Sequence, residues 1–144
     1  YVEGNKFLEQ CSHSEWGAWD LFPADDWTLG NHVTEFSDCV YKEGKGDADL
    51  LVANNAFAKE MLARGLTGAD LGAVQLWPRA GAPAGLDNAI SFKWITGFPT
   101  LSAYANFTHI WWNEGLMPAW SSLYGDVVSC DSGRVYQSHV MSRP

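Results

Sequence analysis

Basic residues are scarce in this sequence, and their scarcity excludes two common classes of partner. The 144 residues include nine Lys and Arg against seventeen Asp and Glu, which makes the formal net charge -8. Electrostatic attraction to a phosphate backbone or to anionic lipid needs the opposite sign of charge. The composition therefore argues against nucleic acid and anionic membrane surfaces as partners.

Long apolar runs and catalytic motifs are also absent. Lys, Asp, Asn or Gly interrupts every apolar stretch, whereas a helix that crosses a bilayer needs about 20 consecutive apolar residues. We therefore expect no membrane span. The sequence has no Ser nucleophile motif, no phosphate-binding glycine loop and no dinucleotide-binding fingerprint. No motif therefore identifies a reaction, and we expect no cofactor.

Cysteine is sparse and widely spaced. Cys11, Cys39 and Cys130 form no CxxC pair, which argues against a zinc knuckle or a thioredoxin-type redox site. Two interpretations stay open: buried thiols that pack as small hydrophobic groups, or one disulfide with a spare thiol. Cys11 and His13 could present sulfur and imidazole to copper or zinc from one side of an extended strand. Two ligands do not define a site, so no metal is expected.

Apolar residues are abundant and predict a folded chain. Hydrophobic residues make up 47% and aromatic residues 14%, with eight Trp, which is enough apolar surface to offset chain entropy in one domain. We expect that domain over residues 33–144, after a Trp-rich arm over residues 1–32. Residues 7–22 loosely echo residues 126–141. The arm is therefore the last strand of a preceding repeat, a strand that pairs with a neighbouring subunit, or an irregular extension packed on the sheet.

Hydrophobic periodicity and turn residues predict six regular elements after the arm. They are strands over residues 33–42, 69–77, 89–96 and 127–141, and helices over residues 47–65 and 100–115. Pro78 should close the second strand, and Gly133 should bend the last. The order β-α-β-β-α-β predicts an α+β fold of the ferredoxin-like type, in which one antiparallel sheet carries both helices on one face.

This layout leaves one face of the sheet without a helix, and an apolar face of that size would need a cover. We expect a homo-oligomer or a subunit of a larger assembly, with room for an apolar ligand between two sheets. Aromatic residues on adjacent strands are the candidate lining, although core or subunit packing is the favoured explanation for them. The candidates are Trp77, Phe92, Trp94 and Tyr136.

The same layout makes the first and last strands neighbours. Cys39 and Cys130 could therefore form a disulfide if their Cα atoms lie within about 7 Å. Two histidines are candidates for a general base near neutral pH. His109 lies on the second predicted helix, where a core histidine is the alternative to a ligand, and His139 on the last strand could project into a barrel interior.

Four segments between residues 33 and 142 resemble a known group of proteins. They are EFSDCVYKEGKGDADLLVANNAFAKEMLARG, SFKWITGFPTLSAYANF, IWWNEG and VVSCDSGRVYQSHV. The chain is similar to uncharacterised bacterial proteins with the dimeric α+β barrel fold, whose layout resembles the antibiotic-biosynthesis monooxygenase, EthD and stress-responsive barrel families. The resemblance implies two ferredoxin-like units around a small-molecule pocket.

The resemblance also implies a location and two candidate functions. Export to a secreted or periplasmic location would agree with Tyr1 as the first residue, and the cytoplasm is the alternative. The first function is a non-enzymatic module that self-associates or joins a larger complex and holds an apolar ligand. The second is a cofactor-independent monooxygenase or isomerase that acts on a hydrophobic small molecule and uses a pocket histidine such as His139.

Overall fold

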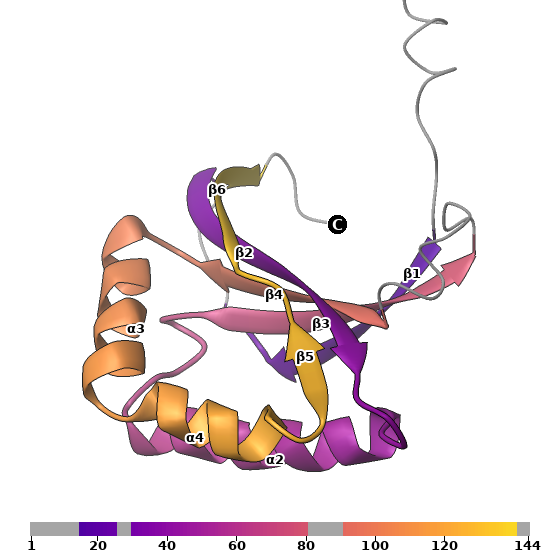
Figure 1. Cartoon of the computed structure of the whole chain (residues 1–144). Helices are drawn as coiled ribbons and strands as arrows, with labels where there is room; N and C mark the ends of the chain where they lie inside the picture. Colours follow the sequence, from indigo (N-terminus) through magenta and orange to yellow (C-terminus); the bar gives the residue numbers. More distant parts are fainter. Residues whose placement is uncertain (1–14, 26–29, 81–90, 141–144) are drawn as a thin grey trace, which may run out of the picture.

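One antiparallel sheet organises the chain, as seen in a computed structural model that describes residues 15–25, 30–80 and 91–140 (Figure 1). In chain order the elements are β1 (Glu15–Phe22), β2 (Gly30–Tyr41), α2 (Asp47–Ala63), β3 (Gly72–Ala80), β4 (Phe92–Phe98), α3 (Leu101–Asn113), α4 (Leu116–Tyr124), β5 (Val128–Cys130) and β6 (Arg134–Val140). The α+β class is confirmed. The described residues form six strands and three helices, more than the four strands and two helices predicted.

The strands lie in the order β1-β3-β4-β2, and β5 and β6 follow one another along the remaining edge of β2. β1 pairs with β3 of the same chain, with Ala18 opposite Leu76. Residues 15–22 of the predicted arm therefore belong to this sheet. β2 already begins at Gly30, three residues before the predicted start of the domain.

The bounds of β3 differ from the predicted strand over residues 69–77 at both ends. Asp70 accepts hydrogen bonds from the amide and the hydroxyl of Thr67, each at 2.9 Å, and this turn delays the strand until Gly72. Pro78 does not end the strand, because β3 pairs with β4 only as far as Leu76 and continues beside β1 to Ala80. A proline without N–H is tolerated where one side of a strand has no partner.

The strand before α3 was predicted to end at residue 96. Instead, β4 continues through Gly97 to Phe98, which pairs with Val33. Phe98 is fully buried against Tyr104 and Phe107 of α3, with ring centroids 5.1 and 5.2 Å apart. Thr100 then caps α3 by accepting a hydrogen bond from Ala103 N at 3.0 Å, as the sequence predicted. Packing of Phe98 therefore outweighs the turn signal of Gly97.

The last predicted strand is split into β5 and β6 by residues 131–133, where the bend at Gly133 was expected. Cys130 of β5 lies opposite Cys39 of β2, and the two form a disulfide with their Cα atoms 4.1 Å apart. Cys11 and His13 lie outside the described residues. The disulfide thus joins the long central strand to the edge of the sheet.

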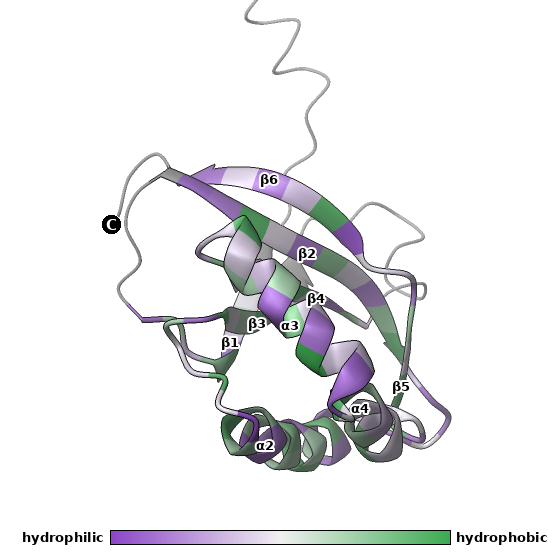
Figure 2. Ribbon diagram, turned by 90° about the vertical axis from the view of Figure 1, so that its left-hand side faces the viewer, coloured by the Kyte–Doolittle hydropathy of each residue, from purple (hydrophilic) through white to green (hydrophobic). Residues whose placement is uncertain are grey.

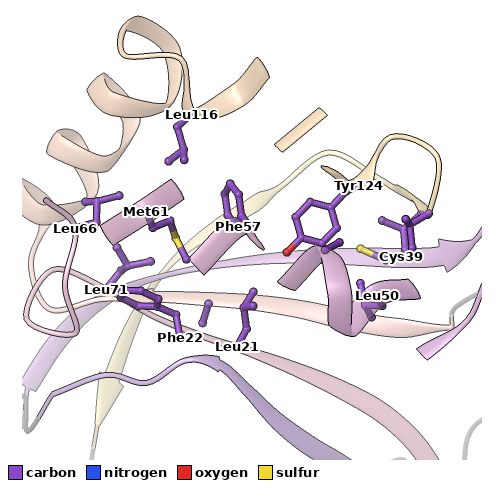
Figure 3. Close-up of a cluster of buried hydrophobic side chains, with 14 of the residues drawn as sticks. Leu21, Phe22, Cys39, Leu50, Phe57, Met61, Leu66, Leu71, Leu116 and Tyr124 are labelled. Carbon is purple, nitrogen blue, oxygen red and sulfur yellow. The ribbon is translucent and has the colours of Figure 1, made fainter. Parts of the chain in front are cut away.

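All three helices pack on one face of the sheet. α2 and α4 lie side by side beneath it, and α3 crosses in front of it in Figure 2. Fully buried side chains between α2 and the sheet include Leu50, Met61 and Leu71 (Figure 3). In the part of the chain that the structure describes, no helix combines the length and apolar character that a bilayer crossing requires.

Candidate functional site

A cavity of about 460 Å³ lies between the sheet and the helices that cover it. This volume is within the range of about 300 to 1,000 Å³ that is usual for small-molecule sites. Strands, all three helices and the segment between β5 and β6 contribute to its wall. The aromatic residues of the wall are Phe57, Trp94, Tyr104, Phe107, Trp111, Trp112 and Trp120.

The spacing of aromatic residues on α3 explains how they reach the cavity. Tyr104, Phe107 and Trp111 follow one another at intervals of three and four residues, which places them on one side of a helix. Their rings continue onto α4: Phe107 and Trp111 have centroids 5.7 Å apart, and Trp111 and Trp120 are 6.1 Å apart. Trp94 of β4 then lies 6.5 Å from Trp120. The wall is therefore a connected group of rings from three elements.

Arg64 at the end of α2 positions the corner between α3 and α4. Its Nε donates to the carbonyl of Glu114 at 3.0 Å, and its Nη1 contacts the Glu60 carboxylate at 2.6 Å. Gly115 at this corner has a φ of 78°, a left-handed conformation that favours glycine. This corner sets the angle between α3 and α4, so that Trp111 and Trp112 of α3 and Trp120 of α4 line the same cavity.

Glu35 is the polar residue placed most unusually in this wall. Side chains alternate between the faces of a strand, so Glu35 of β2 faces the helices, as the buried Cys39 does four residues later. Burial raises the pKa of the Glu35 carboxyl above its ordinary value of 4.5. Within the described residues this carboxylate makes no hydrogen bond or ion pair. A half-buried acid therefore lies among aromatic rings without a compensating charge.

Because Gly133 has no side chain, it leaves room for the Glu35 carboxylate beside it. A Cβ atom at Gly133 would stand 2.0 Å from Oε1 of Glu35, closer than any real contact. The bend between β5 and β6 brings this backbone over the acid. A side chain at this position would have to displace the Glu35 carboxylate from where it lies.

The second acid of the wall, Asp131, already has partners. Its carboxylate accepts from Arg134 at 2.9 Å and from the backbone N–H of Asp38 at 2.8 Å. Arg134 and Lys93 both pair with Asp38, and together they outweigh burial and hold the pKa of Asp38 below its usual value. The strand neighbours of Asp38 and Lys93 face the helices, so the side chains of Asp38 and Lys93 lie on the opposite, helix-free face of the sheet. No Lys, Arg or His is among the described residues that line the cavity.

Of the predicted ligand-binding residues, the structure places only Trp94 at the cavity. Trp77 and Phe92 share its face of the sheet but pack against each other, with ring centroids 5.8 Å apart, and do not line it. Tyr136 is on the opposite face, 52% exposed, against Phe36. The cavity therefore lies between the sheet and its own helices, whereas the sequence analysis placed a ligand between two sheets.

The two predicted histidines lie away from the cavity. His109 is exposed on α3, where its Nε2 lies 3.5 Å from the Glu114 carboxylate. The preceding residue, Thr108, lines the cavity, and the turn of the helix directs His109 away from it. The expectation of a core histidine at this position is wrong. His139 is exposed on β6 and bonds to Asn31 Oδ1 at 2.9 Å. Neither histidine is placed to act on a molecule in the cavity.

Sequence reasoning missed Glu35, although one signal could have found it. The alternation that buries Cys39 and Tyr41 also turns Glu35 and Ser37 toward the helices, but Phe36 and Val40 on the other face obscure this pattern. Among the residues that the structure describes, no group of three or more His, Cys, Asp or Glu is arranged to hold a metal ion. No known family model, curated protein or solved structure matches this chain.

Proposed function

We propose that this chain is a binding module that holds a small apolar molecule in the cavity between its sheet and its helices. The observation that carries the proposal is the wall of aromatic rings around about 460 Å³. Apolar and aromatic walls with few polar groups are typical of small-molecule sites, because they contribute desolvation while a single polar group orients the ligand. Of the polar residues in the wall, Glu35 is the acid without an ion-pair partner among the described residues, so it is the group proposed to orient the ligand.

Glu35 also favours a second candidate function, a cofactor-independent enzyme that moves a proton on a hydrophobic substrate. A half-buried carboxyl with a raised pKa is suited to general base catalysis. Binding is the better supported function, because the other acid among the described residues of the wall, Asp131, is already paired with Arg134. Turnover lost in Glu35→Gln, with ligand binding retained, would favour the enzyme.

The fold proposal is a ferredoxin-like unit enlarged by one strand and one helix. β2, α2, β3, β4, α3 and the β5–β6 edge follow the order β-α-β-β-α-β, and the sheet order β3-β4-β2-β6 interleaves the two halves. This interleaving is typical of the split strand-helix-strand arrangement. β1 extends the sheet beside β3, and α4 is added after α3. We propose on this basis a relationship to the dimeric α+β barrel proteins.

Self-association through the helix-free face of the sheet is part of the same proposal. Phe36 packs on the exposed Tyr136 there, with ring centroids 5.6 Å apart, and Ile95 is only half-buried. Apolar groups on a sheet face are commonly covered by a partner, and a second copy of the chain is the partner proposed. Native mass spectrometry at micromolar concentration should show a dimer, and a monomer would contradict this.

The disulfide between Cys39 and Cys130 supports a secreted or periplasmic location. Disulfides persist in oxidising compartments and are rare in the cytosol of most cells. Thiol counting on protein purified from its natural compartment under denaturing, non-reducing conditions tests this location. Reactive thiols from both residues would contradict it.

A neutral fluorescent probe, N-phenyl-1-naphthylamine, tests the binding function directly. We expect its emission to rise on titration into the protein and its affinity to fall at least about tenfold in Trp112→Ala, because Trp112 lines the cavity. Trp19→Ala is the matched control: both tryptophans are exposed, at 64% and 51%, but Trp19 lies on β1 outside the wall. Equal loss in both variants, or no binding to the unaltered protein, would overturn the proposal.

A further inference from the structure

We infer that the molecule bound in this cavity is an organic cation, an ammonium group carried on an apolar or aromatic skeleton. The juxtaposition that points to it is a cavity wall that combines the Glu35 carboxylate with four tryptophan side chains and, among the described residues, contains no basic side chain. This inference rests on the proposed function, because it names the chemical class of the ligand that the cavity would hold.

The charges around the cavity are arranged to favour a cation. Asp131 is compensated by Arg134 at 2.9 Å, and the other nearby base, Lys93, pairs with Asp38 on the opposite face. Glu35 has no such partner among the described residues. A buried charge is costly without a counter-charge, so an ammonium group from a ligand would supply what the chain itself does not.

The tryptophan rings favour a cation independently of Glu35. The faces of tryptophan rings carry negative electrostatic potential, and they attract ammonium groups more strongly than other aromatic rings do. Trp94, Trp111 and Trp120 belong to one connected group, in which successive ring centroids are 6.1 and 6.5 Å apart. A quaternary ammonium group makes no hydrogen bonds and suits such a wall, where few polar side chains are present.

Ligand charge and proton binding at Glu35 are therefore linked. The empty cavity favours the protonated acid, because burial raises its pKa, whereas a bound cation favours the ionised form. The other titratable groups of the wall are Tyr104 on α3 and Asp131 before β6, and the lining residues of α2, α4, β1, β3 and β4 are uncharged. Affinity for a cation should rise as pH increases through the raised pKa of Glu35, with release of a proton.

The test compares two probes of the same shape, phenyltrimethylammonium and tert-butylbenzene, each measured by displacement of N-phenyl-1-naphthylamine. At pH 7.5 we expect the cation to bind at least about tenfold more tightly than its neutral isostere. Glu35→Gln should lower this ratio several-fold, to the part of the preference that the tryptophan rings contribute. Glu43→Gln is the control, because the same chemical change at an exposed turn outside the wall should keep the ratio.

The pH profile provides a second readout. The preference for the cation should decline between pH 7.5 and pH 4.5 in the unaltered protein and stay flat in Glu35→Gln. Equal affinities for the two probes, or an undiminished preference for the cation in Glu35→Gln, would overturn the inference and leave the binding function standing. Displacement by neither probe from a protein that binds the dye would also overturn it. Failure of the dye itself to bind would instead contradict the proposed function.

Discussion

Asn54 of α2 and Gln75 of β3 exchange two hydrogen bonds inside the core: Asn54 Nδ2 donates to Gln75 Oε1 at 2.8 Å, and Gln75 Nε2 donates to Asn54 Oδ1 at 3.2 Å. The hydroxyl of Tyr124 on α4 donates to the same Asn54 oxygen at 2.9 Å. Burial holds the pKa of this hydroxyl above its usual value, so it remains a donor. The network fixes two helices on the sheet beside the cavity.

Asn54→Ala should lower the free energy of unfolding by about 2 to 4 kcal/mol, because it leaves the fully buried Gln75 amide and the Tyr124 hydroxyl without their partner. Asn55→Ala is the matched control, since Asn55 is exposed one position along the same helix. Its effect should stay within about 0.5 kcal/mol. Urea denaturation followed by tryptophan fluorescence measures both, and equal effects would show that the network contributes little.

Removal of the disulfide in Cys39→Ala/Cys130→Ala should lower the free energy of unfolding by about 2 to 5 kcal/mol, because the bond closes a loop of 91 residues in the unfolded chain. The same loss should follow when the unaltered protein is denatured in the presence of a reductant. The double variant should not respond to reductant. A reductant effect of equal size in both proteins would assign the loss to another cause.

Glu35→Gln should stabilise the protein at neutral pH by less than about 1 kcal/mol, since the acid is only half-buried. The folded pKa of Glu35 lies above its ordinary value of 4.5. The stability that protonated Glu35 contributes is therefore full below its unfolded pKa and is lost as pH rises through the folded pKa. The stability gained by the variant should therefore grow as pH rises from the unfolded to the folded pKa, persist at neutral pH and vanish below pH 4. Thermal melts from pH 3.5 to 7.5 measure it, with Glu43→Gln as the control.

Trp94→Lys should unfold the protein or lower its stability by about 3 to 5 kcal/mol, because Trp94 packs under the helices against Tyr124, with centroids 5.0 Å apart. The sequence left core packing and a contact between subunits open for this residue, and at a subunit contact the same change would dissociate an oligomer. Tyr136→Lys on the helix-free face separates the two explanations. It should leave the melting temperature nearly unchanged, and a comparable loss in both variants would contradict this assignment.

Local signals in the sequence predicted the central elements well. The helix predicted over residues 47–65 is α2, which ends at Ala63, and Gly65 just after it has the expected left-handed conformation, with a φ of 77°. The cap at Thr100 was also visible, because both features depend only on neighbouring residues. β1 and α4 were harder to place. β1 exists through its pairing with β3, and α4 is a helix of nine residues whose start depends on the corner at Gly115.

The candidate site was less predictable because it depends on which face of the sheet the helices cover. The run VTEFSDCVY has apolar residues on both faces of β2, so its alternation does not identify the inner one. Trp77, Phe92 and Trp94 were correctly grouped on one face, but that face meets the helices of the same chain. The absence of a basic partner for Glu35 among the described residues arises from contacts distant in sequence and could not be inferred from composition.

The position of the disulfide has a consequence for where the cavity can operate. Cys130 is itself part of the wall, together with Asp131 and Gly133 that follow it, and Gly133 borders the carboxylate of Glu35. Cleavage of the bond to Cys39 would leave this rim held to the central strand by backbone pairing and by the hydrogen bonds between Asp131 and Asp38. Under the proposed function, a reducing milieu should therefore lower the affinity for a bound molecule before the protein unfolds.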